Sequence, residues 1–250
     1  MPKKPVQVVF DSWDTYAAES PDGPIFVSFD VEVAEQDLSD TLTHCARVVI
    51  PILRPNDNGG PVSPESETLY TMEDELTAAL VEHGVKCRLV GRLTCAGVRE
   101  LVFQLDDWEA FRPPVGIWMG GHPEYETDVS EHEGWDFFND CVRPTPEVQL
   151  HMADRRVIRG LVEAGSNPAR KHSLEFFFKG PADGLRTLAR KLEEDGYARR
   201  GPADFGSGEL AMALRMALDE GAICEESQAN ARLAGKLGVT YTGWGAAVVR

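Results

Sequence analysis

The sequence has little of what most enzyme families need for catalysis. Its 250 residues contain no Gly-x-Ser-x-Gly nucleophile turn, no Gly-x-x-x-x-Gly-Lys phosphate loop and no Rossmann glycine pattern. The zinc spacings His-Glu-x-x-His and His-x-His are also absent. We therefore expect a protein that is not an enzyme and that needs no metal or other cofactor.

Cysteine is scarce and scattered. The five cysteines are odd in number and form no Cys-x-x-Cys pair, which argues against a disulfide framework and against a zinc ribbon.

Long apolar segments are missing too. None approaches the roughly 18 residues of a membrane helix, and none follows the basic N-terminus as in a secretory signal. The expected location is the cytoplasm, without a membrane partner.

Positive charge is in short supply, with 25 Lys+Arg against 41 Asp+Glu and a net charge of -16. Such a chain repels phosphate backbones, so direct nucleic-acid binding is not expected. The same charge would attract a basic protein, although acidic surfaces are common in soluble bacterial-type proteins and need no partner. Composition alone leaves both interpretations open.

The first half alternates between strand and helix patterns. Period-two alternation and apolar runs predict strands over 25–33, 44–53, 85–94, 98–106 and 125–129. A helix is predicted from Ser63 as N-cap to Gly84, and a short one over 108–111 that Pro113 and Pro114 should end. Helical spacing over 135–142 stops before Pro144. Strands joined by short connections, with helices between, favour an α+β domain on an antiparallel sheet.

The second half repeats this alternation. A helix over 147–163 lies in the expected connection, after which strands are predicted over 171–179, 197–200, 209–219 and from 239, and helices over 181–196 and 225–237. The segment 209–219 has the composition of a helix, but its large side chains fall on every even position, so we predict a strand. The expected domains are 1–146 and 169–250, joined by a linker helix within 147–168.

Several segments of the second half resemble the ribonuclease E inhibitor B (RraB) family. They are Phe176-Phe177-Phe178 before a leucine-striped helix, Gly196-Tyr197, Leu233-Ala234 and above all Tyr241-Thr242-Gly243-Trp244-Gly245. The resemblance covers about 171–249. It implies a ferredoxin-like α+β fold and a protein that binds ribonuclease E rather than one that catalyses a reaction. Thr242 stands where the family usually has an aspartate, and the acidic tail of some members is missing.

The first half resembles an uncharacterised domain family often found in front of RraB-like domains. The matching segments are 58–61 before a helix with Glu67, Glu73 and Asp74, then 90–94, 97–100 and Trp135 followed by Pro144. The family has no assigned chemistry. We expect two sandwiches of the ferredoxin-like type, each an antiparallel sheet with helices on one face.

The leading functional hypothesis is a cytoplasmic regulator that binds another protein, either ribonuclease E or a different basic protein. The candidate partner-binding residues are the acids and aromatic residues of the last helix and strand, namely Asp219, Glu220, Glu225, Glu226, Tyr241 and Trp244. Tyr241 and Trp244 are amphipathic rings of a kind that serves as an interface anchor or as the lid of a core. Both roles stay open.

Arg92 is the polar residue of the first half with the clearest chemical potential. An arginine in an otherwise apolar strand can clamp an anion with two hydrogen bonds, or it can form an ion pair with Glu100 across the predicted hairpin. The sequence favours the ion pair.

A second hypothesis is a metal-dependent enzyme or small-ligand binder that uses the stretch from His122 to Glu133. If this stretch were a strand, Glu124, Glu126 and Asp128 would share one face and could hold a hard cation. Acidic residues on a solvent-exposed strand give the same pattern. A third hypothesis is an acidic immunity or antitoxin-like protein that neutralises a basic toxin.

Overall fold

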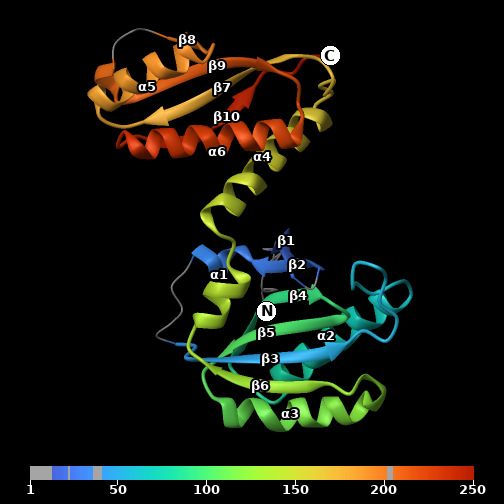
Figure 1. Ribbon diagram of the computed structural model, residues 1–250. Coiled ribbons are helices and arrows are strands. Elements are labelled where there is room, and N and C mark those ends of the chain that lie inside the picture. The colour runs from blue at the N-terminus through green and yellow to red at the C-terminus, as the bar shows by residue number, and fades with distance from the viewer. Residues whose placement is uncertain (1–12, 22, 36–40, 202–204) are drawn as a thin grey trace, which may run out of the picture. The chain divides into compact units, whose positions relative to one another are not determined.

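The computed structural model describes residues 13–21, 23–35, 41–201 and 205–250 (Figure 1). The chain divides into two compact units, Met1–Arg143 and Pro144–Arg250, which we call the first and second domains. The first contains a six-stranded sheet and the second a four-stranded sheet, and the paired strands in both are antiparallel. The predicted α+β class is confirmed. Across the residues described, no helix combines the length and the apolar character that a membrane crossing needs.

The first domain is built around a β-α-β-β-α-β unit. Its elements are β3 (His44–Pro51), α2 (Glu65–Glu82), β4 (Cys87–Cys95), β5 (Val98–Leu105), α3 (Trp108–Gly121) and β6 (Asp128–Glu133). The sheet order β1-β2-β4-β5-β3-β6 places the first strand of this unit between the third and the fourth, as in ferredoxin-like folds. The hairpin of β1 (Trp13–Ser20) and β2 (Gly23–Asp30) extends the sheet beyond β4.

The helices α2 and α3 cover one face of the first domain's sheet, and a further segment packs against β4. Apolar residues of α2 and α3 pack against β3 and β5 in one cluster, which includes Leu69, Met72, Leu76, Val48, Phe103 and Val115. On β4, an added Cβ at Gly91 would lie 2.4 Å from a methyl carbon of Val142, in the π-helical turn η2 (Phe138–Val142). Only glycine allows this approach.

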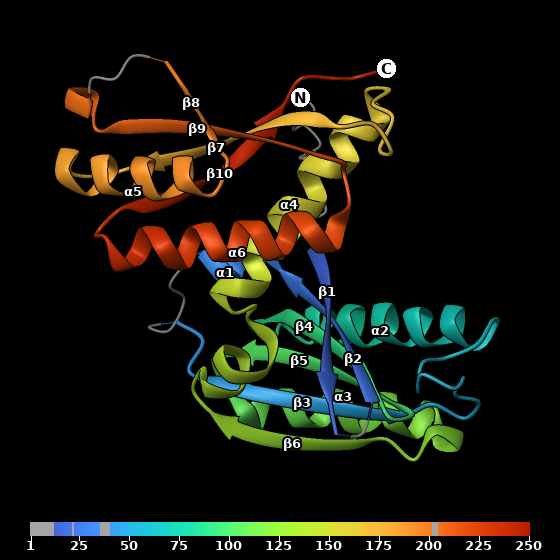
Figure 2. The same cartoon turned by 45° about the horizontal axis from the view of Figure 1, so that its top comes forward.

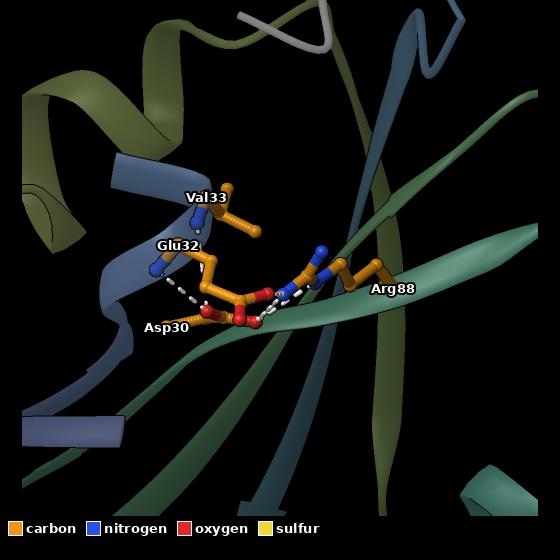
Figure 3. A network of polar contacts seen from close by, with 4 residues as sticks. All are labelled: Asp30, Glu32, Val33 and Arg88. Carbon is orange, nitrogen blue, oxygen red and sulfur yellow. Dashed lines mark hydrogen bonds and ion pairs between the residues drawn. The ribbon is translucent and has the colours of Figure 1, made fainter. Parts of the chain in front are cut away.

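The strand predicted over 25–33 ends early. β2 stops at Asp30, and α1 (Val31–Glu35) follows directly. The Asp30 carboxylate accepts hydrogen bonds from the backbone N–H groups of Glu32, at 3.0 Å, and Val33, at 3.5 Å, which is the geometry of a helix N-cap (Figure 3). Arg88 of β4 donates to both Asp30 and Glu32. The cap at Asp30 therefore starts a helix where the alternation of Val31 and Val33 predicts that the strand continues.

The predicted end of the helix at 108–111 is also wrong, because α3 continues through Pro113 and Pro114 to Gly121. Each proline removes one backbone hydrogen bond from a helix interior. Asp107 caps the start of α3 by accepting from Glu109 N and Ala110 N. The apolar face beyond the prolines is buried at Val115 and Trp118. We attribute the continuation of the helix to this burial.

Three smaller corrections concern boundaries. The strand β1 is not predicted from the sequence. The helix α2 begins at Glu65 with Pro64 as its N-cap, not at Ser63. The strand expected over 125–129 is shifted to Asp128–Glu133, after a 3-10 turn at Pro123–Tyr125.

The second domain contains the same order of elements. They are β7 (His172–Lys179), α5 (Ala182–Glu194), β8 (Ala198–Arg200), β9 (Glu209–Met216), α6 (Glu220–Lys236) and β10 (Thr240–Ala246), with the sheet order β10-β7-β9-β8. Figure 2 shows α5 and α6 beside this sheet. The strand prediction for 209–219 is confirmed, since Leu210 and Met212 are buried and Ala211 and Ala213 occupy the alternate positions.

One strand and one helix of the second domain need comment. The burial of β7 alternates along the strand although Phe176, Phe177 and Phe178 are consecutive, and Phe177 is 41% exposed. The helix α6 starts five residues before the predicted boundary at 225, because the Asp219 side chain caps it by accepting from Ala222 N at 2.8 Å. The helix in the predicted connection, α4 (Pro146–Glu163), packs against α6 and β10, and its Leu161 belongs to the core of this domain.

Candidate functional site

A buried polar network joins three elements of the second domain at Trp244. The Trp244 side chain is 6% exposed, and its indole N–H donates to Asp154 Oδ1 at 2.8 Å. Ser227 of α6 donates to the same oxygen at 3.0 Å. Asp154 lies on α4 and is 2% exposed. The network thus connects α4, α6 and β10, and the Trp244 ring lies in the core.

Hydroxyl groups extend the network to Tyr241 and form a second polar cluster at Tyr197. The Tyr241 hydroxyl bonds to Ser227 Oγ at 3.2 Å. The Tyr197 hydroxyl donates to Glu226 and accepts from Asn230 Nδ2 at 2.9 Å. Burial raises the pKa of Asp154, and hydrogen bonds from Trp244, Ser227 and Cys224 oppose that shift. Burial also raises the pKa of Tyr197 and of Tyr241. Burial therefore favours the protonated forms of Asp154, Tyr197 and Tyr241.

The predicted partner-binding residues do not form one surface. Tyr241 and Trp244 belong to the Asp154 network, and Glu226 accepts a hydrogen bond from the Tyr197 hydroxyl. Asp219 is the cap of α6, and Glu220 pairs with Arg155 of α4 at 3.2 Å. Glu225 is exposed. From the six candidates, the structure leaves Glu220 and Glu225 as acids at the surface of α6.

The sheet of the second domain carries a hollow of about 450 Å³ beside Phe177. Its lining combines aromatic rings and cations, and it includes Phe177, Phe178, Phe205, Lys179, Arg200 and Thr242. The Thr242 hydroxyl donates to Phe177 O at 3.1 Å, so the residue at which this chain departs from the RraB pattern has a backbone partner within the sheet. Lys179 and Arg200 each have an acidic neighbour, Glu209 and Glu175.

In the first domain, the predicted ion pair between Arg92 and Glu100 is wrong. Arg92 faces α2, where its guanidinium donates two hydrogen bonds to the carboxylate of Glu73, one of them at 2.6 Å. Glu100 instead accepts from Arg47 of β3 at 2.6 and 3.0 Å. The two-residue turn at Ala96-Gly97 places Leu93 opposite Glu100, so Arg92 and Glu100 lie on opposite faces of the hairpin.

Arg99 is the polar residue that the sequence reasoning missed. It pairs with Thr94 in the hairpin and is 4% exposed. Its guanidinium carbon lies 4.8 Å from the centre of the Tyr70 ring, and the corresponding carbon of Arg92 lies 5.0 Å from the same ring. Burial, followed by the nearby charge of Arg92, lowers the pKa of Arg99, and interactions with Tyr70 and Glu73 oppose that shift. The sequence signal that could have identified Arg99 is its place on the strand face that otherwise carries Leu101, Phe103 and Leu105.

The segments that carried the first-domain resemblance meet at this hairpin. Gly97 N donates to Gly59 O at 3.0 Å, and an added Cβ at Gly59 would lie 2.6 Å from Ala96 N. Gly59 also has a φ of 73°, which favours glycine. The loop at 58–61, the helix with Glu73 and both hairpin strands therefore converge on one place.

The cation arrangement proposed for the stretch from His122 to Glu133 is wrong. Glu124 lies in the 3-10 turn, Glu126 has a left-handed φ of 40°, and Asp128 begins β6, so the three acids do not share a strand face. His122 bonds to Glu75 at 2.9 Å. Over the ranges that the structure describes, no three His, Cys, Asp or Glu side chains gather in a way that could hold a metal ion.

Comparisons with known proteins agree with both resemblances. Residues 11–142 match the model of DUF695, a family of unknown function, and residues 151–246 match the model described as Regulator of ribonuclease activity B. No curated protein matches the chain. One similar solved structure is that of an unknown protein from Galdieria sulphuraria, which is 12% identical over 82% of this chain and 99% of the other, with a TM-score of 0.22.

Proposed function

We propose that this chain, which belongs to the DUF695 family, is a regulatory protein whose second domain acts by binding another protein rather than by catalysis. The observation that carries the proposal is the match of residues 151–246 to a regulator of ribonuclease activity. That range contains the whole β-α-β-β-α-β unit of the second domain and the Asp154 network beneath it. In its specific form, the partner is a ribonuclease of the ribonuclease E type.

The proposed contact includes the exposed acids of α6. Glu220 is the first residue of α6 and Glu225 lies in its second turn, and both are exposed, so a basic side chain of a partner can reach them. The charge of Glu220 is partly neutralised by Arg155, so the charge of Glu225 is more available to a partner. A contact of this kind weakens as salt rises, because exposed charges are screened over about 10 Å at 0.1 M salt.

The two domains would contribute differently to such binding. The first domain contains 27 Asp+Glu and 10 Lys+Arg, a net charge of -17, whereas the second contains 14 and 15, a net charge of +1. The negative field that attracts a basic partner therefore comes from the first domain. We propose that the first domain raises the association rate and that the second provides the specific contact.

The proposal is tested with the full chain and purified ribonuclease E. Binding is measured by calorimetry at low and at moderate salt, and RNA cleavage is followed at the same protein concentrations. We expect binding that weakens with salt and slower cleavage. If the chain neither binds nor slows cleavage at low salt, the ribonuclease E form of the proposal fails.

Charge-reversal variants locate the contact. Glu225→Lys should weaken binding, whereas Glu194→Lys, an exposed acid on α5, is the matched control and should not. Phe177→Ser tests the hollow on the sheet. If Phe177→Ser abolishes binding and Glu225→Lys leaves it unchanged, the contact is the sheet face and not α6.

A further inference from the structure

Two arginines lie side by side beneath α2 in the first domain. Thr94 and Arg99 face each other across the β4–β5 hairpin, and Arg92 faces Leu101, so Arg92 and Arg99 are diagonal neighbours on the same sheet face. Tyr70 and Glu73, one helical turn apart on α2, lie over them. The site is thus made of two strands and one helix, with no part on a long loop.

The two arginines have different partners. Arg92 holds the Glu73 carboxylate through two hydrogen bonds and lies against the rings of Tyr70 and Trp13. Arg99 Nε and Nη1 are buried, and throughout the described chain they find no hydrogen-bond acceptor. Glu73 does not serve both guanidinium groups, because its two oxygens point to Arg92.

A buried guanidinium with two unpaired donors is costly, even though Tyr70 and Glu73 partly offset the cost of burying Arg99. The desolvation of a charged group is offset only when a counter-charge and hydrogen bonds replace the lost water. The Arg99 guanidinium carries a positive charge, because arginine is not deprotonated in proteins. A structure that keeps such a group next to a second arginine is prepared to receive a negative charge.

We propose that Arg99 is the centre of a site that binds an oxyanion, a carboxylate or phosphate group carried by a small molecule. Planar carboxylates and phosphates match the donors of a guanidinium group, and binding would supply the acceptors that Arg99 Nε and Nη1 lack. Tyr70 is 49% exposed while its ring contacts both arginines, so a rotation of this side chain is the route by which the anion enters. The proposal does not depend on the proposed ribonuclease partner.

The test uses anion titrations of the full chain. Sodium phosphate, sodium acetate and trisodium citrate are compared at a constant ionic strength set with sodium chloride, and both the melting temperature and the binding heat are measured. Saturable binding raises the melting temperature, because a ligand that binds only the folded state stabilises it. A response to phosphate alone identifies a phosphate site, and a response to acetate or citrate alone identifies a carboxylate site. Either result supports the proposal.

Arg99→Met is the decisive variant. It should weaken anion binding by at least about tenfold, which is the effect of losing a charge-assisted hydrogen bond. Without anion, its melting temperature should equal or exceed that of the wild type, because a buried cation with two unpaired donors is replaced by an apolar side chain of similar length. Arg112→Met, an exposed arginine on α3, is the control and should keep the wild-type response.

Three results would overturn the proposal. They are the absence of a saturable response to any of the three anions, a wild-type response in Arg99→Met, and a folded Arg99→Met protein that melts well below the wild type in the absence of anion. The last would mean that Arg99 has a structural partner in the protein itself.

Discussion

The two domains share the strand order of their β-α-β-β-α-β units but differ in how a buried charge is paired. In the second domain, Asp154 Oδ1 accepts hydrogen bonds from Trp244 and Ser227, which come from two other elements, while Oδ2 is buried without such a partner among the described residues. In the first domain, Arg99 Nε and Nη1 are buried and donate to no acceptor among the described residues. The donors to Asp154 come from the fold itself, whereas the unpaired donors of Arg99 are the basis of the anion site proposed above.

The two domains also differ in net charge. Two domains of the same topology carry net charges of -17 and +1, so the topology does not determine the charge. Net charge acts on association and solubility and only weakly on the choice of fold. The acidic character of the chain therefore belongs to the first domain, although the sequence resemblance to a regulator belongs to the second.

The largest expected effect is the loss of the donor to Asp154. Trp244→Ala removes a buried ring and its N–H group together, so we expect the free energy of unfolding of the second domain to fall by about 3 to 5 kcal/mol. The measurement is denaturant unfolding, with hydrogen exchange to assign the transition to a domain. Val248→Ala removes a partly exposed side chain near the same end of the chain and is the control. A loss below about 1 kcal/mol for Trp244→Ala would contradict the core position of the ring.

A smaller effect is expected from the carboxylate in the first domain. Glu73→Gln removes the carboxylate charge that Arg92 contacts beside Arg99, and we expect a loss of about 2 to 3 kcal/mol in the first domain, less than for a fully buried pair. Asp74→Asn, an exposed neighbour on α2, is the control. In an Arg99→Met background the same change should cost less, because the second cation is gone. Equal costs in both backgrounds would mean that the two arginines do not interact.

Much of the fold could be predicted because local patterns and packing agree. The stripe of Leu185, Leu188 and Leu192 is buried as a helix, and the strand over 209–219 followed from its even positions. The predictions failed where a side chain caps the backbone locally. Asp30 turns the end of a valine-rich strand into a helix, and Asp219 starts α6 early. The alternation of apolar residues gives no information about such caps.

The candidate sites were harder to predict than the fold. The register of the hairpin follows from its turn of two residues, so the faces of Arg92 and Glu100 were available from the sequence. The sequence does not predict that Arg92 pairs with Glu73, because the two residues are separated by the connection between α2 and β4. Likewise, Asp154 meets Trp244 across 90 residues of chain. Contacts over such separations depend on how the elements pack, which no local pattern contains.

The smallest expected effect is a change with pH in the stability of the second domain. Because burial raises the folded-state pKa of Asp154 above its unfolded value, the folded state binds a proton that the unfolded state releases. The stability contribution of this group is therefore fully present below the unfolded pKa, near 4, and is lost as pH rises through the raised pKa. Asp154→Asn keeps an oxygen for Trp244 and Ser227 but cannot ionise. The difference in unfolding free energy between Asp154→Asn and the wild type should thus shift in favour of the variant as pH rises from about 4, and should level off once Asp154 is ionised in both states. A difference that stays constant over this range would mean that Asp154 has an unshifted pKa. Its charge would then be fully compensated by its donors, and the contrast with Arg99 would be larger still.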